Sequence, residues 1–336
     1  MYQLKFLPKS IKKKIFKILG FLVGGIILIA IGFFAFVSFT WNKTYDAPYP
    51  EVSISTDSTV LARGQYLVYG PAHCATCHID PNDYEAMSRG ELVSLAGGSE
   101  INIDPGVFRP RNLTPDIETG IGAMTDEEVA RVMRYGVGHD GRVIFPFMPF
   151  ENMTEYDLNA IISFLRSQPP VKREIEATSF NFLGKAVLAA GLIKPIEPSA
   201  KPLKDLKQES SVIYGEYLAN SVANCAGCHS PRDLKTGEFT GPKFSGGLSF
   251  EEVKGTFTSP NLTPDPETGL LATWNEETFV QRLKGGLIHE GTPMPWSSFA
   301  MMDEVDIRAI YRYLNSLSPV KNKIEQTVAL KSQSEE

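Results

Sequence analysis

Cysteine and histidine are both scarce in this chain of 336 residues, which has four cysteines and five histidines. All four cysteines fall in two short stretches, 74–78 (Cys-Ala-Thr-Cys-His) and 225–229 (Cys-Ala-Gly-Cys-His). No cysteine is therefore left over for a disulfide or a thiolate nucleophile. The two Cys-x-x-Cys pairs would also suit one tetrahedral zinc site, but zinc does not require a histidine after both pairs.

Each of the two stretches is typical of a covalent attachment site for haem c. Two thiols separated by two residues can add across the two vinyl groups of one haem, and the adjoining histidine then binds the iron as proximal ligand. The spacing predicts two covalently bound haem c groups, each with its iron. The residues assigned to this role are Cys74, Cys77, His78, Cys225, Cys228 and His229.

Acidic residues are absent from the first 41 positions, which hold six lysines. A basic segment at 1–17 is followed by an apolar run at 18–40, and about 20 apolar residues suffice to cross a bilayer as a helix. We expect residues 1–17 to stay in the cytoplasm, 18–40 to anchor the chain in the bacterial inner membrane by a single pass, and the rest to lie in the periplasm. A cleaved signal peptide is the alternative, although its apolar core is usually shorter, about 7–15 residues.

The remainder of the chain repeats itself. Gly-x-Tyr-Leu precedes each attachment site, at 64–67 and 215–218, and the two attachment sites lie 151 positions apart. The segment Asn-Leu-Thr-Pro-Asp-x-Glu-Thr-Gly begins at Asn112 and again at Asn261, 149 positions later. A repeat of this length indicates two copies of one domain.

Each copy continues with two helical patterns. The middle helix is predicted at 126–135 and 275–284, and the closing amphipathic helix at 154–167 and 303–316, with Thr154 and Asp303 as N-caps. Gly64 and Gly215 would allow the closing helix to approach closely through Phe164 or Tyr311. The predicted fold is all-α, with an N-terminal transmembrane helix and two tandem class I cytochrome c domains at 56–170 and 207–320, and a C-terminal tail at 321–336.

The connector between the copies, 171–206, holds many charges and prolines around one apolar stretch at 180–193. This stretch is too apolar for a free tether. We expect the connector to wrap one domain and to fix the pair together. A second membrane segment is the alternative, but the stretch is interrupted by glycine and lysine and is shorter than a bilayer requires.

Methionine provides the candidate for the second axial ligand of each iron. Met148 and Met294 are each followed by proline in corresponding loops, between the middle and the closing helix. Methionine paired with histidine raises the reduction potential and closes the iron to small molecules. The metal ligands predicted are therefore His78 and Met148 at the first iron, and His229 and Met294 at the second. His139 and His289, at matching positions ahead of these loops, are the alternative ligands.

From about residue 56 to 320, the chain resembles the cytochrome c subunits of bacterial membrane-bound alcohol, gluconate and sugar dehydrogenases. The shared features are the Gly-x-Tyr-Leu motifs, the run Cys-x-x-Cys-His-Ser-Pro-Arg-Asp at 225–233, both Asn-Leu-Thr-Pro-Asp segments and both Met-Pro loops. The resemblance implies that Asn112, Asn261 and Arg232 lie near haem propionates. Those subunits generally have three haem domains, whereas this chain has two.

These features together favour an electron carrier over an enzyme. We expect a membrane-anchored di-haem cytochrome that receives electrons from a dehydrogenase or a quinol-linked donor and passes them to another cytochrome or a terminal oxidase. Beyond the anchor, 27 basic residues stand against 39 acidic ones, a balance that would steer basic redox partners or serve solubility. Nothing indicates nucleic-acid binding. The alternative is a di-haem enzyme, either a peroxidase or a thiosulfate-oxidising cytochrome, with one open or unusually ligated iron.

Overall fold

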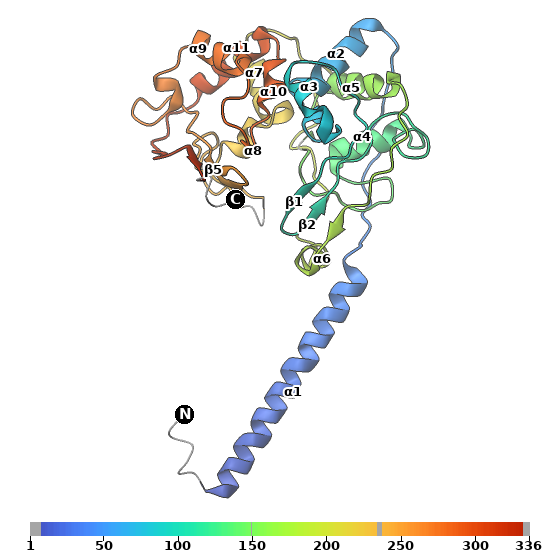
Figure 1. Ribbon diagram of the computed structural model, residues 1–336, viewed down its shortest axis with the longest axis vertical. Coiled ribbons are helices and arrows are strands. Elements are labelled where there is room, and N and C mark those ends of the chain that lie inside the picture. The colour runs from blue at the N-terminus through green and yellow to red at the C-terminus, as the bar shows by residue number, and fades with distance from the viewer. Residues whose placement is uncertain (1–7, 149, 234–236, 332–336) are drawn as a thin grey trace.

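The computed structural model describes residues 8–148, 150–233 and 237–331. The first seven residues of the predicted basic segment, Pro149 of the first Met-Pro loop and the last five residues of the tail lie outside the described residues. Figure 1 shows one long helix leading into a mostly helical body. We describe the body by the ranges predicted above: a first half (56–170), a connector (171–206), a second half (207–320) and a tail (321–331).

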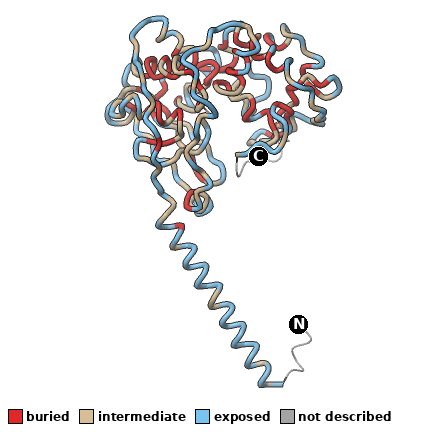
Figure 2. The backbone as a smooth tube through the Cα atoms, turned by 180° about the vertical axis from the view of Figure 1, so that it is seen from behind, coloured by how far each residue is buried: buried red, intermediate tan, exposed pale blue. Residues whose placement is uncertain are grey.

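The long helix α1 (Lys9–Thr40) has 32 residues, or about 48 Å at 1.5 Å per residue. Its stretch from Ser10 to Thr40 is long and apolar enough to span a membrane. Figure 2 shows that nearly the whole helix is exposed. Its exposed apolar side chains include Phe21, Leu28 and Ile29. In water such a surface would be costly, so α1 has the length and surface of a membrane-spanning helix or of a signal sequence.

The two halves contain matching sets of helices. The first half has α2 (Ser58–Tyr69), the short turns η2 (Cys74–Thr76) and η3 (Pro81–Asp83), α3 (Tyr84–Ser88), α4 (Asp126–Tyr135) and α5 (Glu155–Ser167). The second half has α7 (Val212–Tyr217), the π-helical turn η4 (Leu218–Val222), α8 (Cys225–Cys228), the turn η5 (Leu270–Ala272), α9 (Glu276–Lys284), α10 (Trp296–Ala300) and α11 (Glu304–Ser316). The predicted middle and closing helices are thus present in both halves.

Capping residues define where these helices begin. The Thr154 hydroxyl accepts a hydrogen bond from the backbone N–H of Asp157 and begins α5, as predicted. Thr125 and Glu128 form a reciprocal capping box at α4. Asp303 stands at the predicted N-cap of α11 in extended backbone, although no capping bond from its side chain is seen in the described structure.

In each half, the opening helix crosses the closing helix at a glycine. A Cβ added to Gly64 would lie 2.0 Å from the Ala160 carbonyl oxygen, and one added to Gly215 would lie 1.9 Å from that of Ala309. Only glycine permits this approach. The predicted contact with Phe164 is confirmed at Gly64. The predicted contact with Tyr311 is wrong: Tyr313 packs on Gly215, because the closing helix turns that face inward.

The body also contains two small antiparallel sheets, which the all-α prediction did not include. The hairpin of β1 (Ile101–Ile103) and β2 (Gly106–Phe108) is joined by β3 (Ser179–Phe180) of the connector. The hairpin of β4 (Ser249–Glu252) and β5 (Gly255–Thr258) is joined in the same way by β6 (Val328–Leu330) of the tail. Gly106 pairs with Phe180, and Phe257 with Val328. The correspondence between the copies thus extends into the connector and the tail.

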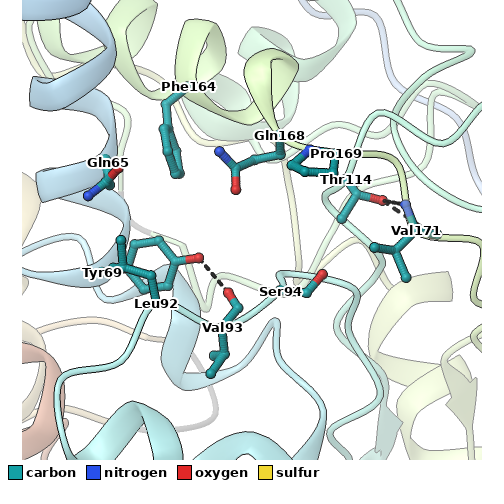
Figure 3. Close-up of a pocket in the computed structure, with 10 residues that line it drawn as sticks. All are labelled: Gln65, Tyr69, Leu92, Val93, Ser94, Thr114, Phe164, Gln168, Pro169 and Val171. Carbon is teal, nitrogen blue, oxygen red and sulfur yellow. Dashed lines mark hydrogen bonds between the residues drawn. The ribbon is translucent and has the colours of Figure 1, made fainter.

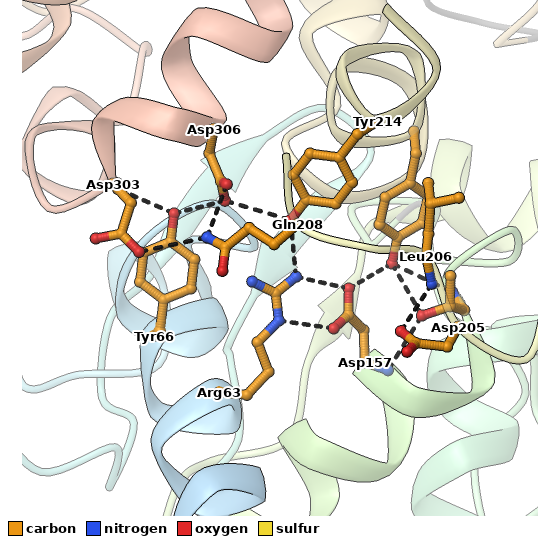
Figure 4. Close-up of polar contacts among 11 residues, drawn as sticks. Arg63, Tyr66, Asp157, Asp205, Leu206, Gln208, Tyr214, Asp303 and Asp306 are labelled. Carbon is orange, nitrogen blue, oxygen red and sulfur yellow. Dashed lines mark hydrogen bonds and ion pairs between the residues drawn. The ribbon is translucent and has the colours of Figure 1, made fainter. Parts of the chain in front are cut away.

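A buried polar network joins the two halves (Figure 4). Two of its tyrosines, Tyr66 and Tyr217, come from the Gly-x-Tyr-Leu motifs. The Tyr66 hydroxyl donates to Asp306 Oδ2 at 2.7 Å and accepts from the backbone N–H of Asp303 at 3.0 Å. The same arrangement recurs between a tyrosine of the second half and two residues of the first half. The Tyr217 hydroxyl donates to Asp157 Oδ2 at 2.7 Å and accepts from the N–H of Thr154 at 3.2 Å.

Arg63 lies at the centre of this network. Its guanidinium forms a two-bond ion pair with Asp157, at 2.8 and 3.0 Å, and donates to the Tyr214 hydroxyl at 3.1 Å. Asp157 is 3% exposed and Asp306 is fully buried. Burial raises the pKa of Asp306, although hydrogen bonds from Tyr66 and Gln208 oppose that shift. The two halves therefore share a polar core that excludes water and whose groups depend on one another.

The connector packs along the first half. Backbone N–H groups of Glu155 and Tyr156 donate to the carbonyls of Leu203 and Lys204, and that of Ile196 donates to Tyr135. Its apolar stretch forms α6 (Phe182–Ala189), a helix of eight residues that is far too short to cross a bilayer. The alternative of a second membrane-spanning segment is therefore excluded.

Candidate haem-binding sites

The two predicted proximal histidines have the same environment in both halves. His78 Nδ1 lies 2.8 Å from the Arg111 carbonyl oxygen, and His229 Nδ1 lies 3.2 Å from that of Pro260. A carbonyl can only accept, so Nδ1 carries the proton and Nε2 keeps its lone pair. Burial lowers the pKa of both imidazoles, with the carbonyl bond opposing the shift. Both rings are thus held neutral, in the form that binds iron.

A tight turn brings each pair of cysteines beside its histidine. The residue before the first cysteine has a left-handed backbone in both halves, with φ of 41° at His73 and 50° at Asn224. One helical turn follows, in which the backbone N–H of His78 donates to Cys74 and that of His229 donates to Cys225. The turn therefore gathers both thiols and the imidazole within five residues.

The leading cysteine of each pair is partly buried against the core. Burial raises the pKa of Cys74 and of Cys225 to about 12. A buried protonated thiol is a poor nucleophile toward solutes. No group of three or more histidine, cysteine or acidic side chains suited to a metal ion occurs in the described ranges. Because all four cysteines lie in those ranges, the two pairs do not form one zinc site.

Met148 and Met294 occupy equivalent turns. The backbone N–H two residues later donates back to the methionine carbonyl in both, at 3.0 Å from Phe150 and 2.8 Å from Trp296. Both side chains are partly buried against the core. The competing ligands, His139 and His289, are exposed. His139 lies in a turn in which the backbone N–H of Gly141 donates to the Gly138 carbonyl. Axial ligation by the two methionines stays a prediction, which this arrangement favours.

Asn112 and Asn261 organise the loops that present the carbonyls to the histidines. Each is 1% exposed. The Asn112 amide donates to the Val171 carbonyl at 2.7 Å, and its oxygen accepts from the N–H of Thr114 at 2.9 Å. Asn261 makes the matching bonds to Val320 and Thr263. Each asparagine directly follows the residue whose carbonyl accepts from the proximal histidine. Its hydrogen bonds therefore hold that carbonyl in place. The implied contact with a propionate remains a prediction.

Arg232 lies beside the second attachment site. Its guanidinium donates to the carbonyls of Gly227 and Gly237, at 3.3 and 3.0 Å, and stacks over Phe239. Its Nε is buried and has no hydrogen-bond partner within the described residues. An unsatisfied cationic donor at this place suits an anionic group such as a haem propionate. In the first half none of the three residues after His78 is an arginine. Asp80, two residues after His78, pairs with Arg173.

The two sites meet at the junction between the halves. Thr76, between the cysteines of the first site, lies 3.3 Å from Ser298 Oγ in α10, the helix that follows Met294. The ring of His73 packs edge-on against Phe299 in the same helix, 5.7 Å between centroids. Nothing in the sequence near His73 indicates this role. Its partner lies in the other half, so no local pattern could have revealed this contact.

A cavity of about 250 Å³ lies in the first half, between α2 and the segment after α5 (Figure 3). The Tyr69 ring packs edge-on against Phe164, and its hydroxyl donates to the Val93 carbonyl. Thr114 and Val171, which belong to the loop held by Asn112, also line the cavity. The cavity contains none of the predicted ligands, and we assign it no role.

Known proteins resemble this chain over most of its length, although no protein-family model matches it. The fructose dehydrogenase cytochrome subunit of Gluconobacter japonicus is 29% identical over 281 residues, covering 80% of this chain and 54% of that protein. The cytochrome c subunit of alcohol dehydrogenase (quinone) from Gluconacetobacter polyoxogenes is 30% identical over 283 residues, covering 79% and 57%. A diheme cytochrome c-type protein of Cereibacter sphaeroides is 28% identical over 275 residues, covering 77% and 86%.

These similarities confirm the resemblance drawn from the motifs. The chain is related to cytochrome c subunits of bacterial dehydrogenases and to a diheme cytochrome c. It spans only about half the length of the dehydrogenase cytochrome subunits that it matches. The relationship supports an electron-transfer cytochrome that carries haem c.

Proposed function

We propose that this protein is a membrane-anchored di-haem c-type cytochrome that carries electrons from a dehydrogenase or quinol-linked donor to another cytochrome or a terminal oxidase. The observation that carries the proposal is the repeated proximal site: a Cys-x-x-Cys-His turn whose imidazole donates Nδ1–H to the carbonyl of a loop held by a buried asparagine. When bound, each haem supplies reversible one-electron chemistry.

The chain's own residues would set the properties of each site. The cysteines tether the haem, and the Nδ1–H bond fixes the ring of His78 or His229 and raises its basicity as a ligand. Met148 and Met294 would supply the second ligand of each iron and would exclude small molecules from it. At the second site, the unsatisfied Nε of Arg232 pairs with a propionate. Methionine ligation at both irons would favour a carrier over an enzyme.

Anchoring follows from α1 and its flanks. The described lysines at the start of the helix and the absence of acid from the first 41 residues favour a cytoplasmic N-terminus. The two tandem class I cytochrome c domains, 56–170 and 207–320, would then lie in the periplasm. Both halves would remain close to the inner membrane, where quinol-linked donors and terminal oxidases are found.

The acidic balance of the exported part suits a basic redox partner, because an acidic surface speeds the encounter with a basic one. The names of the relatives place a dehydrogenase subunit first among the candidate donors. Purification of the protein from its native membrane with its bound partners would identify the donor.

Haem stoichiometry and iron closure test the proposal together. We expect two haems per polypeptide by pyridine haemochrome assay, and two haem additions by mass spectrometry of the denatured chain. We expect neither reduced iron to bind carbon monoxide readily and no turnover of peroxide. A single haem or bound zinc would contradict the attachment sites. Ready carbon monoxide binding or peroxidase activity would contradict the carrier and would support an enzyme.

A further inference from the structure

The apolar helix of the connector lies against the end of α1 that enters the body. The ring of Phe182 stacks on Phe34, 5.5 Å between centroids and 9° between planes, and packs edge-on against Phe33 at 6.0 Å. Trp41 packs edge-on against Phe180 at 6.1 Å. Figure 1 shows α6 at the lower end of the body, beside the point where α1 joins it.

These contacts place α6 at a definite depth. Phe34 lies six residues before the end of α1 at Thr40, or about 9 Å along the axis. The apolar run ends at Phe39, so Phe34 belongs to its final five or six residues. If about 20 apolar residues span the hydrocarbon layer, Phe34 lies inside its outer boundary. Phe182, stacked on Phe34, must then lie at the same level.

One face of α6 is covered by the body and the other is bare. Leu188 is buried, and a Cβ added to Gly184 would lie 2.5 Å from the Pro105 carbonyl oxygen of the β1–β2 turn. On the other face, Phe182 is 45% exposed and Leu183 is 55% exposed. Leu192, in the turn after the helix, is 62% exposed.

Polar and aromatic groups surround this apolar face as they do at a membrane surface. Lys185 Nζ lies 5.2 Å above the ring of Trp41, and Lys43 Nζ donates to the Ala189 carbonyl at 2.6 Å. Tryptophan with nearby lysine is typical of the boundary between hydrocarbon and water, where the ring is half buried and the cation reaches lipid headgroups.

We propose that α6 is an interfacial helix that inserts Phe182, Leu183 and Leu192 into the outer leaflet of the bilayer. This inference rests on the proposed role of α1 as an uncleaved anchor. Lipid is the occupant because it surrounds α1 at this depth, and the bare face of α6 continues the bare surface of α1. The second contact fixes the tilt of the first half over the membrane, which a single helix cannot do.

Photolabelling from the lipid tests this inference on the full, haem-loaded chain. The protein is reconstituted in vesicles of phosphatidylethanolamine and phosphatidylglycerol that contain a phospholipid with a photoactivatable group in its acyl chain. We expect label in α1 and in the peptide 180–193. The double variant Phe182→Glu/Leu183→Glu should lower the label in 180–193 by about tenfold, because charge replaces inserted apolar surface, and should leave the label in α1 unchanged.

The matched control is Val212→Glu/Ile213→Glu. These residues are also adjacent at the start of a short helix, are 42% and 69% exposed, and lie in α7 at the end of the body away from α1 (Figure 1). The control should leave both labels unchanged. Haem absorbance and the yield of membrane-bound protein confirm that each variant folds. A single change, Leu192→Glu, should lower the label in 180–193 by a smaller factor. It keeps the test valid if the double variant does not fold.

Two results would overturn the inference and leave the anchor intact: label in α1 without label in 180–193, or equal label in 180–193 in the wild type and the double variant. Absence of label from α1, with release of the protein by carbonate, would overturn the anchor and the inference with it. The failures are therefore distinguishable.

Discussion

At the scale of single residues, each proximal imidazole depends on an asparagine that does not touch it. Asn112 and Asn261 hold the loops whose carbonyls accept from His78 and His229, and each amide is satisfied by protein groups. This is how a buried polar side chain can determine ligand orientation from the second layer of contacts.

Replacement of either asparagine by alanine should destabilise its half of the protein. The change leaves the N–H of Thr114 or Thr263 buried without an acceptor, which costs about 1–3 kcal/mol. Chemical denaturation followed by haem absorbance measures the loss. Asn82→Ala is the control, because Asn82 is exposed and bonds only locally to Asp80. Equal stability of Asn112→Ala and Asn82→Ala would contradict the role of the loop.

The methionines are tested by exchange for histidine. Iron bound by methionine and histidine has a weak far-red band in the oxidised state, which iron bound by two histidines lacks. Met148→His or Met294→His should each remove about half of this band and lower one reduction potential while the other stays nearly unchanged. Met153→Leu, in the core of the first half, is the control and should preserve both. A wild-type protein without the band would refute methionine ligation.

At the scale of helices and strands, the sequence predicts the elements that have a local pattern. The apolar spacing and caps located α4 and α5, and Asn275 caps α9 as the prediction of a helix at 275–284 implies. The cysteine and histidine positions also follow directly from the sequence. Strands β3 and β6 are only two and three residues long, and their partners lie over 70 residues away. No periodicity can develop in such short strands.

The contact between the halves could not be predicted from local sequence patterns either. Tyr66 was visible as part of a repeated motif, but Asp306 lies 240 positions further along the chain. The motif tyrosines and the aspartates of the closing helices become partners only once both halves have folded. For the same reason the sequence misassigned Tyr311, since the rotation of α11 that brings Tyr313 to Gly215 is set by packing.

Tyr66→Phe and Tyr217→Phe should weaken this interface to a similar extent. Each change removes a hydroxyl that donates to a buried aspartate and accepts from a helix N-cap, and the expected cost is about 1.5–3 kcal/mol. Denaturant unfolding would measure it. Tyr84→Phe, at a residue that is 43% exposed, should change the stability little. A large loss in only one of the two network variants would contradict the reciprocal arrangement.

At the scale of the whole molecule, the proposed anchor α1 can be tested by removing it. If residues 1–41 are replaced by a cleavable export signal, the haem-loaded body should be released from membranes by a carbonate wash, because α6 alone is too short to span them. Fractionation followed by haem staining measures this. The full chain is the control and should resist the wash. Retention of the shortened protein would place the anchor in 180–193.

The network between the halves departs from symmetry at Arg63 and Tyr214, and this departure affects which surfaces recognise each other. Arg63 and Tyr214 lie 151 positions apart, at equivalent places in the repeat, and they bond directly to each other. Two first halves from separate molecules would bring two guanidinium groups together, a repulsive meeting. A first half facing a second half instead joins a cation to a phenol. The difference between arginine in one half and tyrosine in the other therefore disfavours pairing between first halves of separate molecules. It favours pairing of the first half with the second half of the same polypeptide.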